Sequence, residues 1–256
     1  MEPKQQRLMF RQQKQSETTS GLCDNYQQAN MVVLPKDYAF AFLLFCMRNP
    51  KSCPLMDVLE PGEVTPAIAD ADVRSDLPKY RIYRDGEWTE DVLDIHAYWR
   101  DDFVTFLIGC SFTFEKALSD AGISLLHQEL NRVVPMYKTT ISLAQAGMFE
   151  GNMVVSMRAI KHEQVDKAVR ISGEFTHAHG RPVHIGDPEA IGISSLMEPD
   201  YGEPAVGETQ ERTPVFWACG VTPQNAAAQA KAPIMITHAP GHMLITDERD
   251  PYYANS

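Results

Sequence analysis

Apolar runs typical of buried strands alternate along the chain with stretches that have helical spacing. One such run, 215–218, is rich in β-branched and aromatic residues and leads into a Cys-Gly turn. Thr222 can cap the next helix, which has Pro223 at its first helical position and extends over 224–231. A second apolar run at 234–237 is typical of another strand. The pattern therefore predicts a strand, a helix and a strand in succession.

This succession predicts a crossover connection, which joins two parallel neighbours in one sheet. Cys219 and His238 would then lie side by side, each just past the carboxyl end of a strand. In open α/β sheets, ligands bind at this edge. We therefore predict an α/β fold with a mixed, largely parallel sheet flanked by helices, and a ligand site at the carboxyl ends of its strands.

The same succession of strand, tight turn and helix occurs twice more. FLIGCS at 106–111 and VHIGDP at 183–188 share this pattern with WACGVTP at 217–223. Each helix start offers free N–H groups and a partial positive charge, which attract anions. If the three starts converge, even an acidic protein can bind a small carboxylate there.

The hydrophobic and polar pattern of the rest of the chain predicts the domain organisation. Residues 1–19 are predicted to form an N-terminal arm, and 20–256 a single domain that can divide into two lobes near 140–150. The helix 36–48 is apolar nearly all round, which predicts a core position. Asp85-Gly86 suits the turn of a hairpin. The acidic segment 197–213 lacks an apolar period and is predicted to be a loop, with closure over the site as one role.

Charge and composition exclude several classes of function. The net charge of −11 argues against a nucleic-acid partner or an anionic membrane surface. The longest apolar run, 38–47, is about half of the length that a membrane span requires. The first 20 residues are polar and do not resemble a signal peptide, and the five cysteines include no CxxC pair. We predict reduced thiols, a cytoplasmic location and a homo-oligomer.

Cysteine and histidine provide the candidate chemistry. Cys219 precedes a helix start, which can depress a thiol pKa and make a nucleophile or an acid; a small buried residue is the alternative. The same two interpretations apply to Cys110. His238 and His242 have a spacing found in metal sites, but Pro240 forbids the continuous helix that this geometry needs. A general acid or base role is therefore favoured over a metal site.

Other polar residues complete the candidate site. His184 and Asp187 could orient one another, or could serve in the core and as a helix cap. Arg158 could form a bidentate pair with a carboxylate or an ordinary ion pair. No Walker loop, GxSxG or GxGxxG occurs, and we predict neither cofactor nor metal. The further residues predicted to bind a small carboxylate substrate are Ser111, Gly220, Thr222 and Thr237.

Several segments in combination resemble the hydro-lyase family that includes the D-glutamate cyclase domain. The resemblance extends from about residue 20 to 247, nearly the whole chain, and its most specific segments are QANMVVLPKDYAFAFLLFCMRNP, WRDDFVTFLIGCSFTFEKAL, VHIGDP, VFWACGVTPQ and ITHAPGHMLITD. It implies conversion of D-glutamate to 5-oxo-D-proline with loss of water, and carries over no residue roles.

Lactam formation requires a neutral amine, an oxyanion site and an acid for the leaving oxygen. We hypothesise that His238 or His242 takes the amine proton, and that Asp187 or Cys219 acts on the leaving oxygen. Main-chain N–H groups at 109–111 and 220–222 would bind the carboxyl groups. Two other functions fit the same residues: a protein that binds a small carboxylate without turnover, and a Cys/His amide hydrolase.

Overall fold

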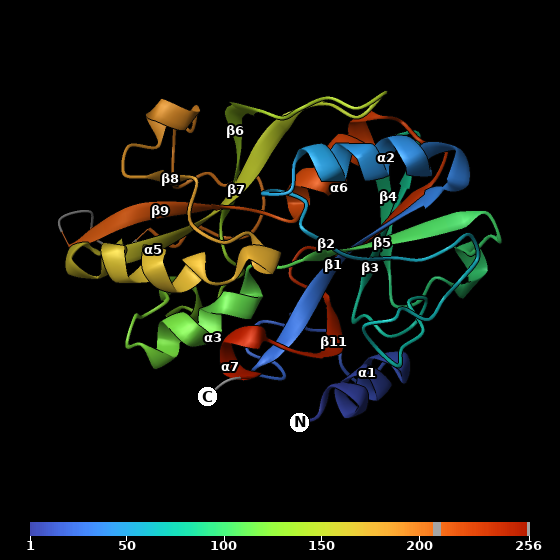
Figure 1. The fold of residues 1–256 in the computed structure, drawn as a ribbon, viewed down its shortest axis with the longest axis horizontal. Coiled ribbons are helices and arrows are strands. Elements are labelled where there is room, and N and C mark those ends of the chain that lie inside the picture. Colours follow the sequence, from blue (N-terminus) through green and yellow to red (C-terminus); the bar gives the residue numbers. More distant parts are fainter. Residues whose placement is uncertain (207–210, 255–256) are drawn as a thin grey trace.

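The computed structural model describes residues 1–206 and 211–254, which form two sheets side by side (Figure 1). The larger sheet has the strand order β2-β5-β1-β10-β3-β4, and β11 also pairs with β1. The smaller sheet has the order β6-β7-β9-β8. The strands are β1 (Tyr26–Pro35), β2 (Leu55–Val58), β3 (Tyr80–Arg84), β4 (Glu87–Val92), β5 (Phe103–Gly109), β6 (Met136–Ser142), β7 (Asn152–Lys161), β8 (His184–Ile185), β9 (Arg212–Ala218), β10 (Met235–His238) and β11 (Leu244–Arg249).

The prediction of a largely parallel sheet is wrong. Within the described ranges, the strand pairs of both sheets are all antiparallel. β9 pairs with β7 and β8, whereas β10 pairs with β1 and β3, so the two strands predicted to be parallel neighbours belong to different sheets. Helix α6 (Val221–Gln229) connects one sheet to the other. The crossover rule applies only to strands of one sheet, and local periodicity does not reveal sheet membership.

The chain enters the smaller sheet once and then returns. After β5 it passes through α3 (Phe112–Asp120) and α4 (Leu126–Glu129) before it forms β6 to β9. It comes back through α6 to form β10 and β11, and ends with α7 (Pro251–Ala254). Both passages between the sheets therefore start with a helix that follows the last residues of a buried strand, β5 on the way out and β9 on the way back.

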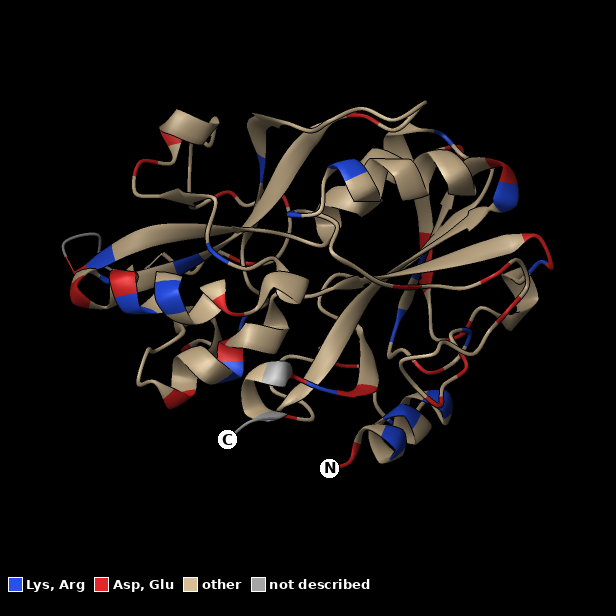
Figure 2. Cartoon of the chain, in the orientation of Figure 1, with Lys and Arg blue, Asp and Glu red and all other residues tan. Residues whose placement is uncertain are grey.

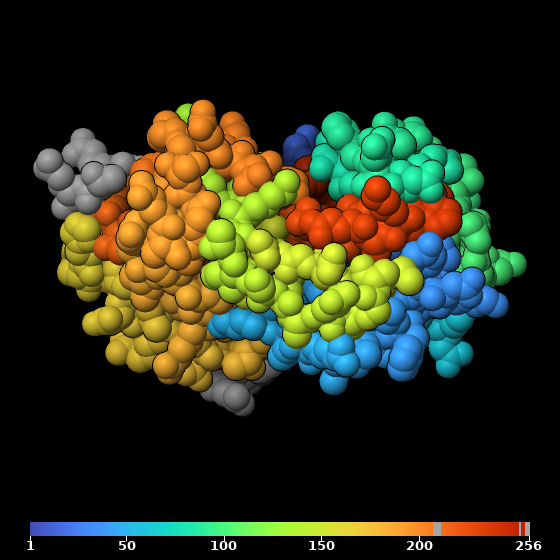
Figure 3. Space-filling view, turned by 90° about the horizontal axis from the view of Figure 1, so that it is seen from above, coloured from blue at the N-terminus to red at the C-terminus, as the bar shows by residue number. Residues whose placement is uncertain are grey.

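Buried apolar side chains cover both faces of the larger sheet. α2 (Lys36–Arg48) lies on one face, where Phe42 contacts Phe106 edge to face with ring centroids 4.8 Å apart. The predicted helix is therefore confirmed, but it is not buried all round, because Phe40 is 77% exposed. The turn between β6 and β7 lies over this helix (Figure 3), and Asn49 hydrogen-bonds Ala144 through both its amide atoms.

The smaller sheet packs against α3 and α5 (Val165–Gly173), with Phe114 and Trp217 in the shared core. In the cartoon of Figure 2, the segments coloured as charged residues lie mostly toward the periphery. The apolar interior between α3 and this sheet makes any buried charge there costly unless it is paired.

Other local predictions have mixed outcomes. The hairpin is confirmed as β3 and β4, and its turn places Asp85 and Gly86 at positive φ. The predicted N-terminal arm contains α1 (Pro3–Arg11), whose buried Arg7 donates to Ile245 O at 2.8 Å. Part of the predicted acidic loop, 207–210, lies outside the described residues. In the part of the chain that the structure describes, no helix is both long and apolar enough to cross a membrane.

Candidate functional site

The starts of α3 and α6 meet at a small cavity of about 20 Å³, which we name the strand-tip pocket. β5 contributes Cys110 and Ser111 from its end, and β9 contributes Cys219 and Gly220 in the same way. His238, the last residue of β10, also lines the pocket. The pocket therefore combines five residues that the sequence predicts for the site, even though the predicted sheet is wrong.

Both thiols of the strand-tip pocket are protonated at neutral pH. Burial raises the pKa of the Cys110 thiol to about 12 and that of the Cys219 thiol to about 11. The N–H of Phe112 faces the Cys110 sulfur, and the N–H groups of Gly220 and Val221 face the Cys219 sulfur; these contacts oppose the rise without cancelling it. Such thiols stay protonated and are not ready nucleophiles.

His238 is a neutral imidazole that is fixed on one side. Its Nδ1 accepts the main-chain N–H of Met31 at 3.0 Å, and the Gln224 amide nitrogen lies 2.8 Å from the same atom. Because a main-chain N–H can only donate, this bond favours a lone pair on Nδ1 and the ring proton on Nε2. Met31 O also lies 3.3 Å from Nδ1, and the Gln224 amide nitrogen lies 3.2 Å from Nε2. Burial lowers the pKa of His238 to about 3, so the ring stays neutral at pH 7 and offers an N–H donor.

A buried ionic cluster lies directly behind the pocket. Glu115 Oε1 accepts from Arg158 Nε at 3.0 Å and from Arg158 Nη2 at 2.5 Å, and it lies 3.2 Å from His127 Nε2. Burial alone would raise the pKa of Glu115, but the charges of Arg158 and His127 outweigh this effect and lower it to about 2. Glu115 is therefore ionised, and it neutralises the guanidinium.

Arg158 connects this cluster to the pocket. Its Nη2 donates to Ser111 Oγ at 3.2 Å and its Nη1 donates to Ser156 Oγ at 3.0 Å, while the guanidinium packs over Phe114 and Trp217. Arg158 has no acceptor atom, so the Ser111 oxygen must accept this bond. The hydroxyl hydrogen of Ser111 is then free to donate to a molecule in the pocket.

Three predicted residues lie near the pocket without lining it. Thr222 Oγ1 donates to Val154 O at 3.0 Å and accepts the N–H of the same residue, which ties α6 to β7. Thr237 donates to the carbonyl of His238 at 2.9 Å. The ring nitrogens of His242 face the carbonyl oxygens of Pro240 and Ser16 at 2.8 and 3.1 Å, and burial lowers its pKa.

The third predicted helix start lies elsewhere. His184 is on β8, where its Nε2 is 2.6 Å from the carbonyl oxygen of Asp187. The Asp187 carboxylate accepts the N–H of Glu189 at 3.0 Å, and the 3-10 turn Glu189–Ile191 follows Pro188. Neither residue lines the strand-tip pocket. Two of the three predicted helix starts therefore converge.

Sequence reasoning missed residues that belong to this region. Asn30 lines the pocket, and its Nδ2 donates to Gly109 O at 2.8 Å. A Cβ on Gly220 would lie 2.1 Å from that nitrogen, so glycine is required for this close approach. A buried polar side chain directly before the apolar run 31–34, as at Asn30, is a signal that could have been recognised. Glu115 and His127 carry no such signal, because their importance comes from Arg158, which is distant in the sequence.

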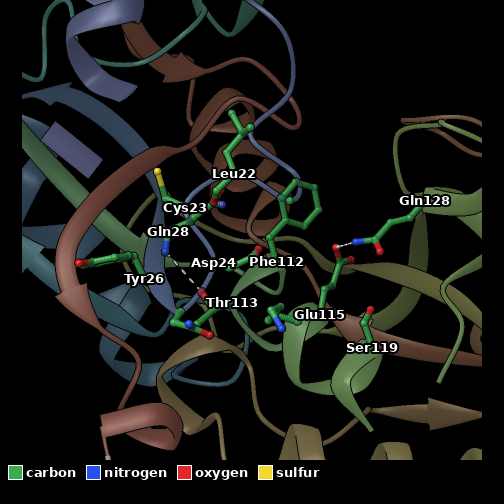
Figure 4. A pocket seen from close by; sticks show the side chains of 13 residues that line it. Leu22, Cys23, Asp24, Tyr26, Gln28, Phe112, Thr113, Glu115, Ser119 and Gln128 are labelled. Carbon is green, nitrogen blue, oxygen red and sulfur yellow. Dashed lines mark hydrogen bonds between the residues drawn. The ribbon is translucent and has the colours of Figure 1, made fainter. Parts of the chain in front are cut away.

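A second cavity of about 210 Å³ adjoins the first, and we name it the Gln28 pocket (Figure 4). Gln28 from β1 lines it, together with Thr113 and Glu115 from α3 and the loop 21–26. Phe112 lines both cavities and lies between them. Within the described ranges, no group of three His, Cys, Asp or Glu side chains is arranged to bind a metal ion.

Comparison with known proteins agrees with the resemblance inferred from the sequence segments. The family model for D-glutamate cyclase matches residues 104–247, which include both helix starts and His238. This match shows that the chain is an enzyme. It belongs to the D-glutamate cyclase family, and the predicted resemblance is confirmed.

Three bacterial relatives, each named provisionally as a hydro-lyase, align over nearly their full length. A protein of Oceanobacillus iheyensis is 66% identical over 97% of this chain and 98% of its own. Relatives in Geobacillus kaustophilus and Bacillus subtilis are 55% and 54% identical over 98% of this chain, and over 95% and 98% of theirs. A nitrogen repressor-like protein of Methanococcus jannaschii aligns with a TM-score of 0.42 and 11% identity over 96% of both chains, which is too distant to support an argument.

Proposed function

We propose that the protein is a carbon–oxygen hydro-lyase acting on a small amino dicarboxylate, and that it cyclises D-glutamate to 5-oxo-D-proline with loss of water. The observation that carries the proposal is the convergence of two helix starts, protonated thiols and a neutral imidazole on the strand-tip pocket. Membership of the D-glutamate cyclase family supports the choice of substrate.

The reaction needs groups that relay protons. Cyclisation forms a bond between the α-nitrogen and the γ-carboxyl carbon, and it breaks one C–O bond of that carboxyl group. The ammonium nitrogen loses two protons, and the leaving oxygen gains two and departs as water. The site therefore needs no net source or sink of protons, and it needs hydrogen-bond donors for the negative charge that develops on oxygen.

The residues of the strand-tip pocket fit these requirements. The Cys219 thiol gives a proton to the leaving oxygen, and the N–H groups of Gly220 and Val221 stabilise the resulting thiolate until it takes a proton from the amine. The same exchange occurs twice, so that two protons pass from the nitrogen to the oxygen that leaves as water. Ser111 and the Nε2–H of His238 donate to the γ-carboxyl oxygens. We assign His238 this donor role, in place of the proton acceptance that its residue type suggests, because Nδ1 already accepts a bond from Met31.

Substrate binding must enlarge the strand-tip pocket. Its volume of about 20 Å³ suits a single water, whereas glutamate has ten non-hydrogen atoms. Phe112 lines both this pocket and the cavity of about 210 Å³, so its side chain is the one whose displacement would join the two spaces. We propose this movement as part of binding.

The amide-hydrolase alternative is disfavoured by the thiols. A nucleophilic cysteine requires a depressed pKa, and burial raises the pKa of both Cys110 and Cys219. A protein that binds a carboxylate without turnover stays an outcome of the experiment below, since the same donors would bind the ligand.

The test is direct turnover. Purified protein is incubated with D-glutamate, L-glutamate or 5-oxo-D-proline, and products are followed by chiral chromatography and by the loss or gain of one water in the mass spectrum. We expect 5-oxo-D-proline from D-glutamate and its reduction to background in Cys219→Ala. Ligand-induced thermal stabilisation without any product would instead identify a binding protein. Product formation unaffected by Cys219→Ala would remove the thiol from the mechanism.

A further inference from the structure

The Gln28 pocket contains a buried acceptor without a partner. Gln28 is 4% exposed, and its Nε2 donates to the carbonyl oxygens of Thr19 at 2.9 Å and Leu22 at 3.3 Å. Because carbonyls only accept, these two bonds fix which amide atom is nitrogen. Oε1 then has no hydrogen-bond partner in the protein. A buried acceptor of this kind costs free energy unless a donor reaches it.

Other acceptors surround the same space. Glu115 Oε2 accepts one hydrogen bond, from Gln128 Nε2 at 2.9 Å, and a carboxylate oxygen can accept a second (Figure 4). Asp24 lines the cavity from the loop, and Lys116, a cation among the lining residues, is paired with Asp120. Arg158 occupies the other Glu115 oxygen, Oε1, so the acceptors with remaining capacity are Gln28 Oε1 and Glu115 Oε2. A ligand must bring several hydrogen-bond donors to them, as a primary ammonium group does.

The two pockets lie in register along one strand. Gln28 lines the larger cavity, and Asn30, two residues further along β1, lines the strand-tip pocket. Side chains two residues apart share a face of a strand and lie about 7 Å apart. This separation suits a molecule that carries an ammonium group at one end and a carboxylate at the other, with a short carbon chain between them.

We infer that the Gln28 pocket is the ammonium half of the site at which the extended substrate first binds: Gln28 Oε1 and Glu115 Oε2 bind the α-ammonium group of an amino dicarboxylate, and the γ-carboxyl group reaches the strand-tip pocket. Ring closure then requires the nitrogen to leave Gln28 and approach the γ-carboxyl carbon. The inference rests on the proposed function for the identity of the ligand. It assigns selectivity for the ammonium group to Gln28, whose buried Oε1 gains a partner when the ligand binds.

Binding measurements test the inference without requiring turnover. Titration calorimetry is performed on the full-length protein with D-glutamate, with glutarate, which lacks the ammonium group, and with N-acetyl-D-glutamate, in which that group is a neutral amide. We expect glutarate and N-acetyl-D-glutamate to bind about 10- to 100-fold more weakly than D-glutamate, since hydrogen bonds to a charged group are lost. Equal affinities would overturn the inference.

A pair of variants tests whether Gln28 is the residue that makes binding selective for an ammonium group. Gln28→Leu removes the unpartnered acceptor, and we expect its affinity for D-glutamate to fall to the level of glutarate while glutarate binding stays unchanged. The matched control is Gln27→Leu, which changes the neighbouring residue on the opposite face of β1, where Nε2 contacts Arg249 O at 3.3 Å. If Gln28→Leu fails to fold, the ligand series on the unaltered protein still decides the question.

The outcomes separate this inference from the proposed function. Ammonium-selective binding without product would retain the Gln28 pocket and reject the cyclase reaction. If Gln28→Leu still binds D-glutamate more tightly than glutarate and the protein turns D-glutamate over, the proposed reaction stands and the inference about Gln28 is rejected. Gln28 Oε1 would then accept a hydrogen bond from water only.

Discussion

Arg158 of β7 donates a hydrogen bond across 3.2 Å to the hydroxyl of Ser111, which stands between the last strand residue of β5 and the start of α3. The bond fixes the direction in which Ser111 can donate. The guanidinium is itself fixed by Glu115, so the orientation of a pocket donor depends on an ion pair outside the pocket.

Removing the Glu115 charge should destabilise the fold strongly. Glu115→Gln leaves the buried Arg158 without its anion, and we expect a loss of about 3–5 kcal/mol in the free energy of unfolding. The measurement is urea denaturation. Asp102→Asn is the matched control, because it breaks an exposed bidentate pair with Arg100 and should cost about 1 kcal/mol or less. Equal losses in both variants would contradict a buried, charge-dependent cluster.

Replacing His238 should impair turnover without unfolding the protein. In His238→Asn, Oδ1 can still accept the Met31 N–H, but the Nε2–H donor is gone. We expect kcat/KM for D-glutamate to fall about 100- to 1000-fold, with circular dichroism unchanged. His96→Asn, at an exposed histidine, is the control and should behave like the unaltered protein. Full activity in His238→Asn would exclude His238 from the reaction.

The pocket thiols should resist alkylation in the folded protein. Because burial raises the pKa of Cys110 to about 12 and that of Cys219 to about 11, very little thiolate exists at pH 7. Mass mapping after iodoacetamide treatment should find both residues unmodified under native conditions and modified in urea. Rapid, stoichiometric labelling of Cys219 with a kinetic burst of product would instead favour the amide hydrolase.

Acid should destabilise the protein below pH 6.5. Burial lowers the pKa of His179 to about 4 and that of His238 to about 3, so the folded state binds fewer protons than the unfolded chain. Their contribution to stability is complete above pH 6.5 and is lost as the pH falls toward 4 and then 3. At pH 5 each histidine should account for a loss of about 2 kcal/mol. Urea midpoints at pH 7.5 and 5 measure this, and His179→Gln should reduce the difference.

The contact between Gly220 and Asn30 should make the effects of variants at these two positions on the free energy of unfolding non-additive. Gly220→Ala places a Cβ 2.1 Å from Asn30 Nδ2, and we expect a loss of about 1–3 kcal/mol in stability. Asn30→Ala removes the obstructing amide, so the double variant should be more stable than the sum of the single losses indicates. Strict additivity in urea denaturation would show that the two residues do not interact.

Local elements were predictable, and the sheets were not. The β3–β4 hairpin and the strand endings before Cys110 and Cys219 follow from turn chemistry and short apolar runs. Which sheet β9 and β10 join depends on pairing with residues far away in sequence, and the crossover rule assigned them to one sheet. The strand-tip pocket nevertheless combines Cys110, Cys219 and His238 because each comes at or just after a strand's last residue.

Other parts of the site could not be predicted from the sequence, because they depend on contacts between residues that are far apart in the chain. Glu115 gains its role from Arg158, 43 residues away, and Gln28 from a cavity closed by α3. His184 and Asp187 share the local pattern of the other strand endings but lie on the short strand β8 and in the turn that follows it. The cytoplasmic location and the homo-oligomer stay predictions.

The two passages of the chain between the sheets have a mechanical consequence. Both begin at residues that line the strand-tip pocket, so the pocket lies where the chain passes from one sheet to the other. A small shear of one sheet against the other would move the α3 and α6 starts relative to each other. It would thereby change the distance between the hydrogen-bond donors at the two helix starts.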